Sequence, residues 1–413
     1  MLTRYGTPNP SRCQQSHDDH PSHEQYQRIV NGRSQCEVFD NGVPCSPPFA
    51  RASSRVHLAH LRLRDFRNYR RLDADFTPGF HLLLGHNAQG KTNILEALHL
   101  LATLRSFRGV GSAAMVQHGQ AGWFAGGRVV GNGTHEIKLY WSPRERRLLL
   151  DQQPIRRLTD YLGTFRTVAF CTEDLALVKG AGRGRRRFMD FLLTQTLPTY
   201  LPLLQRYTRA VRARNALLKR RPVDEAALEG FTREVVQLGE EIMTHRRNLL
   251  PELTPRITAA HDRIAPGNEE LTIEYLPSVR TDFESDLKRV QDRERKLGAT
   301  VVGPHRDELA LLLHGKPAAE FASEGQKRTV AIALKMAQAE HLTAIHGTPP
   351  VLLIDDVMGE LDVERRKGFL PLLEQCGGGR GQVFMTCTEE NWPRELSQSL
   401  NRWQVQAGSL EAT

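Results

Sequence analysis

Eight consecutive residues have the spacing of a phosphate-binding loop, G-x-x-x-x-G-K-[ST]. In such a loop, backbone N–H groups point at the β- and γ-phosphates of a nucleotide, the lysine adds a positive charge and the last hydroxyl can ligate Mg²⁺. A strand predicted at 80–84 and a helix predicted at 93–104 flank the loop, in the order that this chemistry requires. We therefore predict that nucleotide is bound by Gly85, His86, Asn87, Ala88, Gln89, Gly90, Lys91 and Thr92.

Two acidic residues follow a second apolar strand. Residues 351–354 are all apolar, and Asp355 and Asp356 come next, which is the form of a Walker B motif. Asp355 is predicted to hold Mg²⁺ together with Thr92, and Asp356 to orient or polarise the attacking water. A further apolar strand at 382–385 leads into a Thr-Cys-Thr sequence, where a polar residue can sense the γ-phosphate. Acids at a strand end can instead cap a turn, but their order with the phosphate loop favours a nucleotide site.

A Ser-Glu-Gly-Gln sequence at 323–326 precedes a predicted amphipathic helix. Ser323 and Gly325 would offer a hydroxyl group and free backbone N–H groups to an anion at the positive end of the helix dipole. The same residues fit an ordinary serine N-cap. Spacing alone does not place Ser323 relative to the phosphate loop.

The rest of the chain predicts an α/β protein with a helical insert. Alternating residues predict an antiparallel layer beside the parallel core, and no heptad pattern lasts for three or four repeats. The layer is predicted from strands at 56–63, 72–76, 126–130, 136–141 and 147–150, and the insert from helices at 224–250, 253–264 and 283–297 with a strand at 271–275. We predict four segments: a disordered extension at 1–55, the first part of a head at 56–175, a helical basic insert at 176–298 and the second part of the head at 299–413.

The positive charge is concentrated in the insert. The 413 residues carry a formal net charge of +9, and between Arg183 and Arg221 eleven Lys or Arg stand against one acid, Asp190. A charge run is most often a solvated face, but this density favours a surface that faces a polyanion. The candidate contacts are Arg185, Arg186, Arg187, Arg206, Arg209 and Arg212.

Composition excludes some classes of protein. No run approaches eighteen apolar residues and the N-terminus has no apolar segment of the secretory kind, so we expect a cytoplasmic protein that does not bind membranes. Six scattered cysteines without a C-x-x-C pair predict free thiols.

From Val56 onward the chain resembles the bacterial RecF family of recombination and replication-repair ATPases, whose heads are of the ABC/SMC type. Several short motifs carry the resemblance in the same order. They stand at 63–69, 85–92, 173–180, 185–188, 303–307, 322–328, 354–357 and 360–362.

The resemblance implies a P-loop ABC/SMC-type ATPase head with an inserted, mainly helical lobe and no long coiled coil. It implies an ATP-dependent head-to-tail homodimer, in which Ser323 of one subunit contacts the γ-phosphate held by Lys91 of the other. Asp362, in the Glu-Leu-Asp motif, joins Lys91, Ser323 and Asp356 as a predicted catalytic residue. The family binds single-stranded and gapped DNA, works with RecO and RecR in loading recombinase, and supports the SOS response. A weak, DNA-stimulated ATPase with ATP and Mg²⁺ is therefore expected.

Two other classes remain as alternatives: a transporter-type ATPase subunit and an adaptor that binds nucleotide without hydrolysing it. The long basic insert opposes the first, and the paired acids Asp355 and Asp356 oppose the second. Residues 1–55 have no counterpart in the family, and we expect translation to start at Val56.

Overall fold

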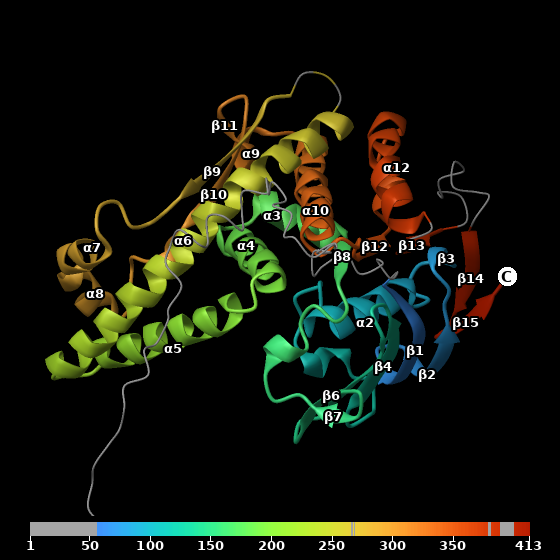
Figure 1. Cartoon of the computed structure of the whole chain (residues 1–413), viewed down its shortest axis with the longest axis horizontal. Coiled ribbons are helices and arrows are strands. Elements are labelled where there is room, and N and C mark those ends of the chain that lie inside the picture. Colours follow the sequence, from blue (N-terminus) through green and yellow to red (C-terminus); the bar gives the residue numbers. More distant parts are fainter. Residues whose placement is uncertain (1–55, 266, 268, 379–380, 389–399) are drawn as a thin grey trace, which may run out of the picture. The chain divides into compact units, whose positions relative to one another are not determined.

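The computed structural model describes residues 56–265, 267, 269–378, 381–388 and 400–413 (Figure 1). The extension predicted to be disordered, 1–55, lies outside the described residues. Within them the chain forms three β-sheets, and two large apolar cores hold sheets and helices together. No described helix is long and apolar enough to span a membrane.

The phosphate loop follows a strand of a mixed six-stranded sheet. Its strands are β3 (Gly79–Leu84), β8 (Thr167–Phe170), β12 (Val351–Asp355), β13 (Gln382–Cys387), β14 (Leu400–Gln406) and β15 (Ser409–Ala412). The order is β15-β14-β3-β13-β12-β8, and every neighbouring pair is parallel except β14 and β15. Parallel strands end at one edge, and only β13 separates β3 from β12. The ends of β3 and β12 therefore meet although they are far apart in the sequence.

The predicted antiparallel layer is present beside this parallel core. Its strands are β1 (His57–Phe66), β2 (Tyr69–Asp75), β4 (Trp123–Val130), β5 (Thr134–Trp141), β6 (Arg146–Leu150) and β7 (Gln153–Pro154). Leu61 and Leu63 are buried while Arg62 is exposed, the alternation expected of a sheet with one face in water. Helix α2 (Lys91–Thr103) packs in the core that the two sheets share, through residues such as Ile94 and Leu98. The phosphate loop is thus mounted on a buried helix.

Helices make up most of the predicted insert. They are α3 (Leu175–Lys179), α4 (Arg183–Thr196), α5 (Tyr200–Leu218), α6 (Glu225–Ile264), α7 (Phe283–Arg289) and α8 (Gln291–Leu297). Figure 1 shows α5 and α6 side by side, with α7 and α8 near the end of α6 where that helix begins. Instead of the predicted helix over 283–297, α7 and α8 are two helices that meet at Val290, whose ψ of 4° is not helical.

Helix α6 corrects the prediction of two helices at 224–250 and 253–264. It runs through 40 residues with Pro251 and Pro255 inside. A proline in a helix interior costs about 3 kcal/mol, which is why the sequence pattern suggested a break. The buried residues continue across the prolines as Leu249, Leu253 and Ile257, so that burial of this stripe offsets the cost.

The remaining elements lead from the insert back to the head. They are β9 (Leu271–Leu276), β10 (Glu308–Leu313), β11 (Lys316–Pro317), α9 (Ala318–Phe321), α10 (Glu324–His346), α11 (Val357–Glu360), α12 (Val363–Gly377) and 3₁₀ helices at Ser112–Met115, Leu158–Asp160, Thr172–Asp174 and Pro304–Arg306. The strands β11, β10 and β9 form a third, antiparallel sheet. Helices α10 and α12 both pack on α6, so the long helix reaches the Ser323 segment.

Candidate nucleotide site

The phosphate loop has a backbone that only glycine accommodates at two points. Gly85 and Gly90 have φ of 146° and 116°, and a Cβ at Gly90 would lie 2.5 Å from the Asn68 side-chain nitrogen. Lys91 is only 4% exposed. Its Nζ donates hydrogen bonds to the carbonyl oxygens of Gly85, at 2.6 Å, and His86, at 3.0 Å. The ammonium group is thus held against the loop, where the phosphates of a nucleotide would bind.

The structure brings Thr92 and Asp355 together. The Thr92 hydroxyl donates to Asp355 Oδ1 at 2.8 Å, and the Thr386 hydroxyl donates to the same oxygen at 2.9 Å. Burial raises the pKa of Asp355 to about 6, against the opposing effect of these two hydrogen bonds. A part-buried carboxylate beside hydroxyl groups fits a divalent cation that prefers oxygen ligands. Described residues form no cluster of three or more His, Cys, Asp or Glu.

Asp356 stands next to this carboxylate in a left-handed conformation, with φ of 54°. Aspartate tolerates this region better than most residues. Its backbone N–H donates to the Thr386 hydroxyl at 2.9 Å. Thr386, in the polar end of β13 that the sequence singled out, therefore fixes both Walker B acids.

Sequence reasoning gave no role to the turn between β1 and β2, which supports the loop from behind. The Asn68 side chain donates to the Gln89 carbonyl at 2.7 Å and accepts from Asn93 at 2.8 Å. The Tyr69 hydroxyl donates to the Gly90 carbonyl at 3.1 Å. The only sequence signal was that Asn68 and Tyr69 belong to one of the short motifs.

A buried ion pair under the loop was also missed. Glu96 on α2 is fully buried and accepts two hydrogen bonds of 2.8 Å from the guanidinium of Arg67. Ser106 donates to the same carboxylate, and Arg108 lies 3.7 Å from it. An acid among the mostly apolar residues of α2 was the signal that could have revealed this pair.

Ser323 and Asp362 each cap a helix. Ser323 is exposed and caps α10, where its hydroxyl accepts from Gln326 N at 3.2 Å. Asp362 caps α12 and pairs with Arg365, whose Nε donates to Thr329 on α10 at 2.8 Å. The structure shows no hydrogen bond or ion pair from Ser323 or Asp362 to the loop residues. One chain therefore holds the predicted catalytic residues in two separate groups.

The basic run of the insert is partly internal, which changes the set of candidate DNA contacts. Arg185 pairs with Glu308 at 2.7 Å and also donates to carbonyl groups of 177–180. Arg186 donates to the Asp307 carbonyl at 2.6 Å. Both groups stabilise the fold because they tie α4 to β10 and the segment before it. The candidates that remain exposed are Arg187, Arg206, Arg209 and Arg212.

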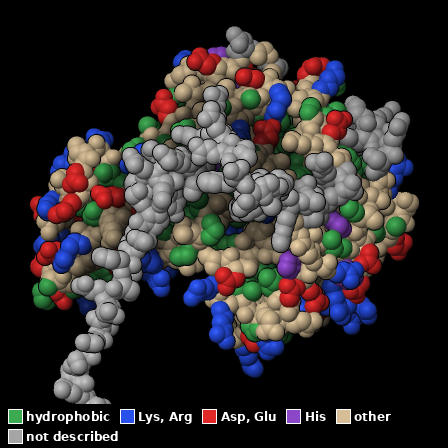
Figure 2. All heavy atoms as spheres, viewed as in Figure 1, with side chains coloured by type: hydrophobic (Ala, Val, Ile, Leu, Met, Phe, Trp, Pro, Cys, Tyr) green, Lys and Arg blue, Asp and Glu red, His purple; other side chains and the backbone are tan. Residues whose placement is uncertain are grey.

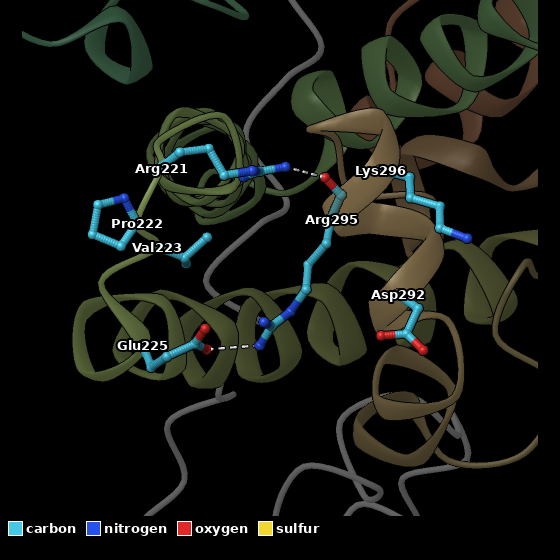
Figure 3. A pocket seen from close by; sticks show the side chains of 7 residues that line it. All are labelled: Arg221, Pro222, Val223, Glu225, Asp292, Arg295 and Lys296. Carbon is cyan, nitrogen blue, oxygen red and sulfur yellow. Dashed lines mark hydrogen bonds and ion pairs between the residues drawn. The ribbon is translucent and has the colours of Figure 1, made fainter.

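Charged side chains at the tip of the insert also form hydrogen bonds and ion pairs within the fold. A pocket of about 530 Å³ there is lined by Arg221, Pro222, Val223, Glu225, Asp292, Arg295 and Lys296. Figure 3 shows Arg221 donating to the Arg295 carbonyl, at 2.7 Å, and Arg295 pairing with Glu225, at 2.9 Å. These contacts join the α5–α6 turn to α8, and the mixed charges of the pocket do not favour an anion.

Exposed arginines also cluster near β6 and β7, a region that was not predicted from the sequence to be basic. Figure 2 shows Lys and Arg side chains mixed with acids both on the insert and in the region of β6 and β7. The exposed arginines of that region are Arg144, Arg146, Arg147, Arg156 and Arg157. Positive charge is therefore not confined to the insert.

The Gly-Pro-His-Arg-Asp motif at 303–307 does not join the nucleotide site. Asp307 is fully buried and lies 3.1 Å from the buried Arg246, which also pairs with Asp190 at 2.9 Å. Tyr275 donates to Asp307 as well. This motif is a buried polar network that joins α4, α6 and β9.

Comparison with known proteins identifies the family of the chain. The family model for the RecF/RecN/SMC N terminal domain matches residues 57–409. A protein of Symbiobacterium thermophilum called DNA replication and repair protein RecF is 37% identical over 371 residues, covering 86% of this chain and 98% of that protein. The protein of the same name from Lactococcus lactis is 37% identical over 359 residues, covering 86% of this chain and 99% of its own.

Solved structures give the same result. A structure described as the recombination mediator protein RecF-ATP in the RecFOR pathway superposes with a TM-score of 0.81 at 29% identity, covering 88% of this chain and 99% of that one. The Smc head domain of Pyrococcus furiosus shares the fold, with a TM-score of 0.52 at 15% identity over 87% of this chain and 96% of that one. The chain belongs to the RecF family, within the RecF/RecN/SMC group of ATPase heads.

Proposed function

We propose that this protein is an ATP-dependent DNA-binding protein of recombinational repair and replication. Relatives of matching length are named DNA replication and repair protein RecF, and the ATP complex of RecF is described within the RecFOR pathway. The observation that carries the proposal here is the contact of Thr92 with Asp355, because it joins the phosphate loop to the acidic strand.

The loop residues 85–92 bind the phosphates of ATP, with Lys91 as the cation. Thr92 and Asp355 hold Mg²⁺, which when bound neutralises charge on the β- and γ-phosphates. Asp356 accepts a hydrogen bond from the attacking water and orients it. ATP turnover at this site is weak, and its role is to end the ATP-bound state that binds DNA.

Dimerisation completes the site. Ser323 and Asp362 are exposed and make no hydrogen bond or ion pair with the loop of their own chain, so a second copy can present them to the γ-phosphate. ATP between the two copies supplies the difference in affinity that makes the nucleotide a switch, and hydrolysis separates the subunits.

DNA and the RecO and RecR proteins are the proposed partners, with binding at single-strand gaps that helps to load recombinase and supports the SOS response. Arg187 is a specific candidate for a phosphate contact. Its side chain is exposed, and the cations Arg183 and Arg105 interact with it unfavourably. A DNA phosphate would offset the repulsion among these positive charges. The division into head parts at 56–175 and 299–413 and an insert at 176–298 belongs to the same proposal.

The test is binding of the full chain to a gapped duplex with and without ATP, alongside Ser323→Arg. We expect ATP to tighten binding, and the variant to lose that gain while it still binds ATP through its intact loop. Unchanged DNA affinity on addition of ATP would contradict the proposal and favour the transporter or adaptor alternatives. Binding of ATP without turnover would favour the adaptor specifically.

A further inference from the structure

Glu269 contacts the helix cap that presents Ser323. It stands two residues before β9, and the neighbouring Glu270 carbonyl is anchored by the His314 N–H at 2.9 Å. Glu269 Oε1 accepts a hydrogen bond from Gln326 Nε2 at 3.2 Å. Gln326 in turn accepts from the Ser323 N–H at 2.8 Å through its own Oε1.

The second bond of Gln326 determines how its side-chain amide is turned. A glutamine amide has one oxygen and one nitrogen, and only the oxygen can accept from the Ser323 N–H. The Glu269 carboxylate can only accept hydrogen bonds. It therefore fixes the side-chain nitrogen of Gln326, rather than the oxygen, on the side of Glu269. The oxygen is then left facing Ser323, which completes the reciprocal cap of α10.

The other oxygen of Glu269 faces the end of α6. His261 is fully buried, neither of its ring nitrogens has a hydrogen-bond partner, and its Nε2 lies 3.5 Å from Glu269 Oε2. Glu269 is itself only 11% exposed. The carboxylate is thus enclosed between the last turn of the long helix and the start of α10, and it has little freedom to turn away.

We propose that Glu269 is a positioning residue for Ser323: by orienting Gln326 it holds the serine and the first turn of α10 in the geometry that meets ATP bound to a second copy. His261 encloses the carboxylate from the side of α6. The contact joins the insert's long helix to the segment that completes the partner's site. The inference rests on the proposed ATP-dependent dimer.

Two substitutions of Glu269 separate positioning from bulk packing. Glu269→Ala removes the acceptor and leaves Gln326 free to turn, whereas Glu269→Gln still offers a carbonyl oxygen. The matched control is Glu340→Ala, which breaks the Arg263–Glu340 ion pair between the same two helices without contacting Ser323 or Gln326. Thermal unfolding of each variant shows that it folds.

The readout is the protein concentration at which ATP gives half-maximal dimer, measured by sedimentation, together with ATP binding to the monomer. We expect Glu269→Ala to raise that concentration about 5- to 10-fold, since a hydrogen bond to a charged group is lost. ATP binding to the monomer should not change, and Glu269→Gln and Glu340→Ala should stay within about twofold of the parent.

Three results would overturn the inference: Glu269→Ala dimerising like the parent, Glu269→Gln failing as badly as Glu269→Ala, or Glu340→Ala causing the same loss. If the parent protein forms no dimer with ATP, the proposed function itself is wrong and the inference is wrong with it. The parent measurement therefore distinguishes the two failures.

Discussion

The loop side and the serine side of the proposed nucleotide site are built in opposite ways. On the loop side Lys91 is 4% exposed and bonded to two carbonyl groups, and Asp355 accepts from two hydroxyl groups. On the serine side Ser323 is exposed, and half of the Asp362 side chain is in solvent. Folding alone orders the first, so nucleotide meets a preorganised site. The second is ordered locally by helix caps and stays open for a partner.

The largest expected difference between the two sides is in catalysis. Lys91→Ala should lower ATP turnover by about 100-fold or more, because the charge that stabilises the transferred phosphate is lost. Lys138→Ala is the matched control and should leave turnover unchanged, since Lys138 pairs with Glu136 within β5. Steady-state phosphate release measures both variants. Equal turnover of Lys91→Ala and the parent would show that the loop is not catalytic.

The loop side and the serine side should also differ in how much they contribute to the free energy of unfolding. Glu96→Ala leaves the part-buried Arg67 without its carboxylate and should cost about 3 kcal/mol of the free energy of unfolding. Glu324→Ala, an exposed acid beside Ser323, should leave the urea midpoint where it is. A midpoint for Glu96→Ala close to that of the parent would mean that the loop side is not held by its buried pair.

His81, on strand β3 before the loop, should also make the free energy of unfolding depend on pH. Trp403 donates to His81 Nδ1 at 3.0 Å, and burial lowers the pKa of His81 to about 4. The unfolded chain therefore binds a proton first, and stability is lost as the pH falls from 6.5 towards 4. Between pH 7 and 5 the loss is about 2 kcal/mol. His81→Gln should flatten the pH profile by that amount, and an unchanged slope would contradict the assignment.

The smallest expected effect separates two neighbouring arginines of the insert. Arg187→Ala should reduce the slope of log affinity for DNA against log salt by about one, with stability unchanged. Arg185→Ala should instead lower stability, because Arg185 pairs with Glu308. If Arg185→Ala changed the salt slope and Arg187→Ala did not, the division into internal and DNA-facing arginines would be reversed.

The sequence predicted the parts of this molecule that depend on local spacing. The phosphate loop has a fixed pattern, and parallel strands that each end in polar residues must bring those ends to one edge, so Thr92 and Asp355 could be paired in advance. The antiparallel layer followed from alternation of apolar residues along the strands.

Contacts between distant segments were not predictable in this way. Arg185 and Glu308 are 123 residues apart, and a single sequence does not tell which long side chains turn inward. Glu96 was hidden among the apolar residues of α2, and its partner Arg67 comes from the turn between β1 and β2. Helix α6 was divided at Pro251 because local propensity, judged alone, omits the burial that overrides it.

The most direct test of the two-sided site is to mix two inactive variants. Asp356→Asn leaves the serine side intact, and Ser323→Ala leaves the loop side intact without adding bulk between the subunits, so each should be inactive alone. In a mixed dimer one of the two composite sites contains neither substitution. Random pairing of equal amounts should therefore restore about a quarter of the parent's ATP turnover per chain. No recovery on mixing, with both variants folded and binding ATP, would contradict a site shared between two copies.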